Sequence, residues 1–126
     1  MEDDLSKITN GALVNRAADE TNPYEFRLRA GRKAVQEYAN AGDSKKLESV
    51  CCDVRLPREV RVEAGQELVK YSSTQGKDIM LWHLRGSPLE EVAKAAAEAI
   101  KAMASGKRLG EHPVVAAGRD KAVARN

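Results

Sequence analysis

Aromatic residues are scarce in this chain, and their scarcity narrows the folds that it can form. Phe, Trp and Tyr together make up 4% of the 126 residues, whereas hydrophobic residues of all kinds make up 42%. A core of Ala, Val and Leu with few aromatic side chains favours helix packing over a β-sandwich, because strands are enriched in aromatic residues and depleted in alanine. Only four prolines interrupt the chain, and each stands where a helix would begin. We therefore expect an all-α protein.

Long apolar runs are also missing. No stretch of the sequence approaches the roughly 18–20 apolar residues that a membrane-spanning helix needs. The N-terminal sequence MEDDLSK is acidic and lacks the hydrophobic region of a signal peptide. We expect a cytoplasmic protein with no membrane association.

Residues with catalytic or metal-binding chemistry are few and scattered. Cys51 and Cys52 are adjacent, so on a helix their side chains point about 100° apart and do not form a CxxC-type chelate. The alternative is a zinc site completed by His83 and His112, but buried or half-buried cysteines are far commoner. A disulfide is not expected in a cytosolic helical protein. The sequence has no glycine-rich phosphate loop, Ser/His/Asp set or inward carboxylate pair, so we expect no catalytic residue, metal or cofactor and no enzyme activity.

A repeat with a period of 34 residues is the main positive feature. Asp19–Val35 reads DETNPYEFRLRAGRKAV, and Asp53–Val69 reads DVRLPREVRVEAGQELV. A shift of 34 positions without a gap superimposes identical residues: Leu13 on Leu47, Asp19 on Asp53, Pro23 on Pro57, Glu25 on Glu59, Arg27 on Arg61, Ala30 on Ala64, Gly31 on Gly65, Val35 on Val69 and Gly42 on Gly76. Self-similarity at a fixed period of this size is typical of a helical repeat protein.

Each copy begins with a proline that suits the first turn of a helix, followed by a glutamate placed favourably against the helix dipole. Two apolar stripes then follow at helical spacing. One stripe holds Phe26, Ala30 and Ala34 in the first copy and Val60, Ala64, Leu68 and Tyr71 in the second. The other holds Leu28, Gly31 and Val35, then Val62, Gly65 and Val69. A helix that is apolar on two sides needs a partner on each side. Since a mid-helix glycine costs roughly 1 kcal/mol relative to alanine, Gly31 and Gly65 indicate close approach of a neighbouring helix, with ligand contact as the alternative.

The order of aspartate, proline, branched residue, arginine and alanine resembles the pattern of HEAT repeats, including the phycobilisome-lyase-like and armadillo-like kinds. The resemblance covers roughly residues 12–104 and implies a short α-α superhelix of about three helical hairpins. It also implies that Asp19, Arg27, Asp53 and Arg61 form a ladder between successive repeats. The third unit departs from the pattern, because Ala93 replaces the arginine and Arg85 stands near the aspartate position.

We expect one domain over residues 1–126, with repeats at roughly 12–42, 46–76 and 78–105 and a helix or tail at 107–126. The expected helices, six or seven in number, cover residues 3–18, Pro23 to about Asn40 with Asn22 as N-cap, Ser44–Val54, Pro57 to about Tyr71, Lys77–Arg85, a helix from Pro88 capped by Ser87, and Pro113–Ala124, which is either helical or frayed. Residues 72–76 and 105–111 are expected as loops. In Lys77–Arg85 either Ile79 or Leu81 is the equivalent of Leu47. The helix from Pro88 has a core stripe of Val92, Ala96, Ile100 and Met103 and, on its back, Lys94, Ala97 and Lys101, like a capping repeat.

Charged side chains on the repeated helices form the first candidate binding surface. The densest basic cluster, residues 27–33, includes Arg29, Arg32 and Lys33, which could bind phosphate. Arg29 aligns with Glu63 and Lys33 with Glu67, so pairing between stacked repeats is the competing interpretation. Trp82, the only tryptophan, is either a core residue or a binding hot spot.

We expect a small scaffold or adaptor that binds another protein and is a monomer or weak homodimer. The partner-binding candidates are Arg29, Arg32, Lys33, Glu63, Glu67, Lys70 and Trp82, with Gln66 on the same surface. The alternative is nucleic-acid binding, as in DNA glycosylases built from HEAT-like repeats, through helix 27–33 and the basic C-terminal end. Net charge does shift along the chain, from −3 over residues 1–20 to +4 over residues 101–126. The low aromatic content and the modest pI of 8.6 weigh against this alternative.

Overall fold

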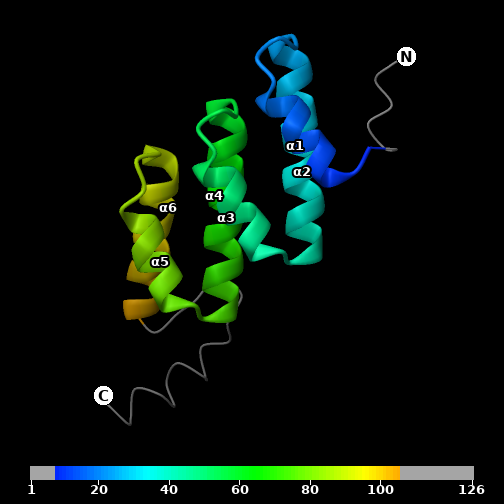
Figure 1. Cartoon of the computed structure of the whole chain (residues 1–126). Coiled ribbons are helices and arrows are strands. Elements are labelled where there is room, and N and C mark those ends of the chain that lie inside the picture. Colours follow the sequence, from blue (N-terminus) through cyan, green and yellow to red (C-terminus); the bar gives the residue numbers. More distant parts are fainter. Residues whose placement is uncertain (1–7, 106–126) are drawn as a thin grey trace. The chain divides into compact units, whose positions relative to one another are not determined.

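The computed structural model describes residues 8–105, which form six α-helices and contain no strand (Figure 1). The helices are α1 (Asn10–Ala18), α2 (Tyr24–Ala41), α3 (Ser44–Cys52), α4 (Arg58–Gln75), α5 (Asp78–Arg85) and α6 (Glu90–Ala104). The expectation of an all-α protein is therefore confirmed for the described residues. The start of the first expected helix and the helix expected at 113–124 lie outside them. The chain divides into two compact units, Met1–Leu68 and Val69–Asn126, and α4 contributes to both.

The first unit packs α1 along α2, with α3 beside α2 (Figure 1). Its core consists of small and branched aliphatic side chains, as the shortage of aromatic residues predicts. Leu13 and Ala17 of α1 are completely buried, which confirms that they face inward. The other members of this core include Ala30, Ala34 and Val35 of α2, Leu47, Val50 and Cys51 of α3, and Val60, Ala64 and Leu68 of α4.

Gly31 allows α2 to approach α4 closely. A Cβ atom added at Gly31 would lie 2.6 and 2.8 Å from the two γ-carbons of Val60. Val60 is fully buried, and its branched side chain has little rotamer freedom in a helix. The close approach predicted for Gly31 is confirmed, and its counterpart Gly65 is buried as well.

The two copies of the sequence repeat also end their long helices in the same way. Gly42 follows α2 with φ of 67°, and Gly76 follows α4 with φ of 69°, both in the left-handed region that favours glycine. The next residue in each copy donates its N–H to the carbonyl oxygen five positions earlier, Asp43 to Tyr38 at 2.9 Å and Lys77 to Ser72 at 2.8 Å. The 34-residue period is therefore a property of the backbone as well as of the sequence.

The second unit packs α5 against α6. Its core includes Leu81 and Leu84 of α5 and Val92, Ala96 and Ala99 of α6. Leu81 is fully buried whereas Ile79 is 87% exposed, so Leu81 is the equivalent of Leu47. Ile100 and Met103, expected in the core stripe, are only half-buried, and Ala99 takes a buried place. No helix in the described range is both long and apolar enough for a membrane span.

Several helix boundaries differ from the expected ones because local hydrogen bonds decide them. Pro23, not Asn22, occupies the N-cap of α2, and the Asn22 side chain instead donates to the Arg16 carbonyl at 3.1 Å. The helix expected to reach Val54 ends at Cys52, since Asp53 is extended and its carboxylate accepts the Arg55 N–H at 3.1 Å. Val54 was expected on the apolar face of this helix, but it lies beyond the helix end and is 79% exposed.

The longest discrepancy lies at the end of α4. This helix continues through the expected loop to Gln75, and Ser72 and Ser73 are completely buried. The run of serines hides the continuation in the sequence, because serine is only an average helix former. On α6, Ser87 accepts the Leu89 N–H at 3.0 Å, but Leu89 is the N-cap residue and the helix begins at Glu90.

Candidate functional site

The repeated arginines each bind a backbone carbonyl at the end of the preceding short helix. Arg27 Nε donates to the Ala17 oxygen at 2.9 Å, and Arg61 Nε donates to the Cys51 oxygen at 3.2 Å. Both bonds reach back ten residues, from equivalent positions. A cation at a helix C-terminus is favourable because it faces the negative end of the helix dipole.

Arg27 also ties the first repeat to the second. Its Nη2 atom donates to the Arg55 carbonyl oxygen at 2.9 Å, across 28 positions of sequence. This bond joins the turn before α4 to helix α2. One connection between the two copies is therefore an arginine-to-carbonyl hydrogen bond.

The two aspartates of the expected ladder bond within their own turns. Asp19 Oδ1 accepts from Thr21, at 2.6 Å from the hydroxyl and 3.0 Å from the backbone N–H. Asp53 forms an ion pair with Arg55, whose Nη2 lies 2.7 Å from Oδ2. These bonds hold the pKa of each carboxyl below its usual value, and the charges of Arg27 and Arg61 add to the effect. Each aspartate therefore bonds within its own turn and also interacts electrostatically with the arginine of its own copy.

The basic cluster on α2 is partly neutralised by carboxylates. Arg32 Nε lies 3.3 Å from Glu63 Oε1, and Gln36 donates to the other oxygen of Glu63 at 2.7 Å. Lys33 Nζ lies 3.4 Å from a carboxylate oxygen of Glu37, one turn along the same helix. Glu63 thus pairs with Arg32, which lies about one turn along α2 from Arg29, the residue that the repeat aligns with Glu63.

The shift follows from how α2 and α4 pack. Val60 aligns with Phe26 in the repeat, yet it contacts Gly31, which lies farther along α2. The Arg29 guanidinium lies 5.8 Å from the centre of the Phe26 ring. Alignment of two copies gives equivalent positions, but it does not give the register in which the copies pack.

A hydrogen bond that the sequence did not reveal joins the N-terminal ends of the same two helices. The Tyr24 hydroxyl donates to Glu59 Oε1. The bond lowers the pKa of the Glu59 carboxyl and raises that of the Tyr24 hydroxyl. The repeat aligns Tyr24 with Arg58, so only the packing register could have indicated this contact. Together, Arg32, Gln36, Glu63, Tyr24 and Glu59 form a polar seam between α2 and α4.

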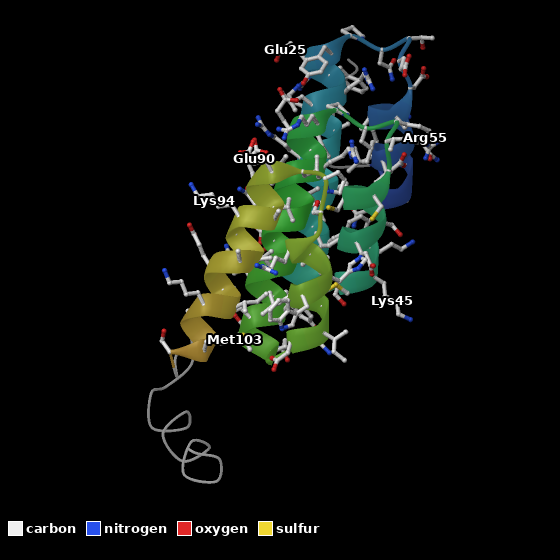
Figure 2. The ribbon with its side chains drawn as sticks, turned by 90° about the vertical axis from the view of Figure 1, so that its left-hand side faces the viewer. Glu25, Lys45, Arg55, Glu90, Lys94 and Met103 are labelled. Carbon is white, nitrogen blue, oxygen red and sulfur yellow. The ribbon has the colours of Figure 1, made fainter. Side chains whose placement is uncertain are left out.

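Trp82 lies on the surface of the second unit. Its side chain is 55% exposed, and the Arg85 guanidinium stands 5.1 Å from the ring centre. Of the two interpretations of this residue, the structure thus favours the surface one. In Figure 2, Glu90 and Lys94 project from the first half of α6, and Met103 lies near its end. Lys70, also a candidate, is exposed on α4.

The two cysteines differ in environment. Cys51 is buried, and burial raises the pKa of its thiol to about 11, whereas Cys52 is exposed. Within residues 8–105, no three His, Cys, Asp or Glu side chains are grouped so as to hold a metal ion. His83 is exposed on α5, and His112 falls outside the described range.

Comparison with known proteins adds no relative: no family model, curated protein or solved structure matches the chain.

Proposed function

We propose that the chain is a short α-solenoid of HEAT-like repeats that works as a protein-interaction module and has no catalytic activity. The observation that carries the proposal is the 34-residue period, which relates Gly42 to Gly76 and Arg27 to Arg61 in both sequence and local geometry. Stacked helical repeats expose extended surfaces, and such surfaces serve as platforms for binding other proteins.

The binding surface is formed by the exposed parts of α2 and α4. The polar seam holds the two helices together, and charged side chains of both signs surround it. The residues assigned to this surface in the first unit are Arg29, Arg32, Lys33, Glu63, Gln66 and Glu67; Lys70, in the part of α4 that belongs to the second unit, is a separate candidate. Mixed charge of this kind supports recognition of a partner with a complementary pattern, because electrostatic complementarity contributes specificity.

Nucleic-acid binding through residues 27–33 has less support. Arg32 and Lys33 each have a carboxylate within 3.4 Å, so part of the positive charge is already neutralised. The aromatic content of 4% also leaves few side chains for base stacking. The basic C-terminal end lies outside the described residues.

A capture experiment from a nuclease-treated extract of the native host tests the proposal. The wild-type chain should retain a protein at a reproducible ratio, and nuclease should not change the amount. A chain with Arg29→Glu and Lys33→Glu should lose that protein. The matched control, Lys45→Glu with Lys46→Glu on α3, changes the net charge equally and should retain it; circular dichroism would verify that both variants remain helical.

Two results would contradict the proposal. Capture that disappears after nuclease treatment would assign the surface to nucleic acid. If no protein were retained at a reproducible ratio, the proposed protein-binding function would be wrong.

A further inference from the structure

The outer face of α5 differs in character from that of α3, its equivalent in the preceding repeat. The 34-residue shift aligns Ile79 with Lys45 and Trp82 with Glu48. Ile79 is 87% exposed and Trp82 is 55% exposed. Two positions that are charged in one copy are therefore large, apolar and exposed in the next. Ile79 and Trp82 are three residues apart, so they lie on the same side of the helix.

Two grooves flank Trp82, and this residue lines both. The first, of about 340 Å³, is lined by Leu81, Ile100, Met103 and Ala104 together with Asp78. The second, of about 550 Å³, is lined by Arg85, Lys94 and Glu90 together with small residues of α6. We call this region the Trp82 face: Ile79, Trp82 and Arg85 of α5, with Lys94, Ile100 and Met103 of α6.

The second groove holds two cations, Arg85 and Lys94, and one carboxylate, Glu90. Arg85 stacks over the Trp82 ring, and within the described part of the chain neither Arg85 nor Lys94 forms an ion pair with a carboxylate. A guanidinium that stacks through its flat face can still offer N–H groups at its edge to a carboxylate. The Trp82 face therefore places an apolar recess and a site for an anion next to one side chain, because Trp82 lines both grooves.

We propose that the Trp82 face binds a peptide segment of a partner protein in which an acidic side chain lies close to a bulky apolar one. The apolar side chain enters the groove beside Ile100 and Met103, and the carboxylate pairs with Arg85 and Lys94. This inference rests on the proposed function in that the ligand is a protein, but it concerns a surface separate from α2.

A nucleic acid fits this face less well. The ring of Trp82 could stack on a base, but a nucleic acid brings a phosphate with every nucleotide and would carry several of them past Asp78 and Glu90, whereas a peptide can bring a single carboxylate to Arg85 and Lys94. Ile100 and Met103 offer apolar surface that a sugar-phosphate backbone cannot match. A peptide supplies both the apolar and the anionic group.

Selection from a random peptide display library on the full chain tests the proposal. Selected peptides should carry Asp or Glu near Leu, Ile, Phe or Trp, and the strongest of them, made synthetically with a fluorescent label, should bind the chain in an anisotropy titration, a readout that does not depend on Trp82. Trp82→Ala should weaken binding by about 30-fold or more, the factor that corresponds to the lower limit of about 2 kcal/mol for a hot spot. Lys94→Glu should also weaken it, and the affinity of the wild type should fall with added salt.

A further variant uses the repeat itself. Ile79→Lys with Trp82→Glu gives α5 the residues found at the aligned positions of α3, and it should abolish binding while leaving the helical content unchanged. The control Lys45→Glu on α3 should bind like the wild type.

Other occupants give different results, each of which would overturn the proposal. Selected peptides without acidic residues, or binding that survives Trp82→Ala, would show that the Trp82 face is not a binding site for acidic peptides. Self-association lost in Trp82→Ala would assign the face to a second copy of the chain. Displacement of the peptide by short single-stranded DNA at lower concentrations than by the unlabelled peptide would assign it to nucleic acid.

Discussion

At the scale of single residues, replacement by alanine should have opposite effects on stability at two helical glycines. Gly31→Ala should destabilise the protein, because the new Cβ would lie 2.6 Å from a carbon of the buried Val60 side chain. Overpacking of this kind costs about 1–3 kcal/mol, which exceeds the gain in helix propensity of roughly 1 kcal/mol. Gly11→Ala should stabilise by up to about 1 kcal/mol, since nothing lies within 4 Å of its added Cβ. Urea denaturation of both variants measures the difference.

The prediction for Gly31 includes a rescue. Val60→Ala alone should be destabilising, but combined with Gly31→Ala it should cost less than the sum of the two single changes, because it removes the clashing γ-carbons. Additive costs would mean that Gly31 and Val60 are not in contact.

The repeated arginines give a second prediction at this scale. Arg27→Ala should destabilise more than Arg61→Ala, because Arg27 donates to two carbonyl oxygens and Arg61 to one. A hydrogen bond to a charged group contributes about 1.5–3 kcal/mol, and exposure of part of each side chain places these bonds toward the lower end. Thermal denaturation beside the control Lys45→Ala would measure the ranking. Equal losses of stability in the two variants would mean that the hydrogen bond from Arg27 to the Arg55 carbonyl oxygen contributes nothing.

At the scale of the helices, the glycines that end α2 and α4 test whether the two copies of the repeat are structurally equivalent. Gly42→Ala and Gly76→Ala should each destabilise by about 1–2 kcal/mol, since a Cβ is strained in the left-handed conformation. Gly86 ends α5 with φ of −90°, and Gly86→Ala should therefore have little effect. Calorimetry would compare the unfolding temperatures of the three variants. If Gly42→Ala lowered stability and Gly76→Ala did not, the two helix ends would not be equivalent.

The helices also show what sequence reasoning can and cannot supply. The existence of α2 and α4, their buried stripes and the role of Gly31 were predictable, because they depend on spacing within one segment. The end of α4 was not, because Ser72 and Ser73 are average helix formers that become buried only through packing. The pairing of Glu63 with Arg32 depends on the register between helices, which no single segment contains. The exposure of Trp82 likewise depended on the phase of α5, which short apolar runs leave open.

At the scale of the whole molecule, binding to duplex DNA distinguishes the two classes of function. We expect only low-affinity, non-specific binding, attributable to the basic residues between Lys101 and Arg125, that disappears as salt increases. Each neutralised phosphate releases counterions, so affinity carried by such contacts falls steeply with salt concentration. Fluorescence anisotropy at rising salt would measure it. Tight binding that persists at about 200 mM salt would instead favour the nucleic-acid alternative.

Backbone NMR assignment of the full chain tests the 34-residue repeat most directly. The account predicts two uninterrupted helices, Tyr24–Ala41 and Arg58–Gln75, each ended by a glycine with positive φ, at Gly42 and Gly76. It also predicts contacts between the Gly31 α-protons and the Val60 methyl groups. A break in the second helix near Tyr71, or a negative φ at Gly76 beside a positive one at Gly42, would show that the copies fold differently and would contradict the repeat.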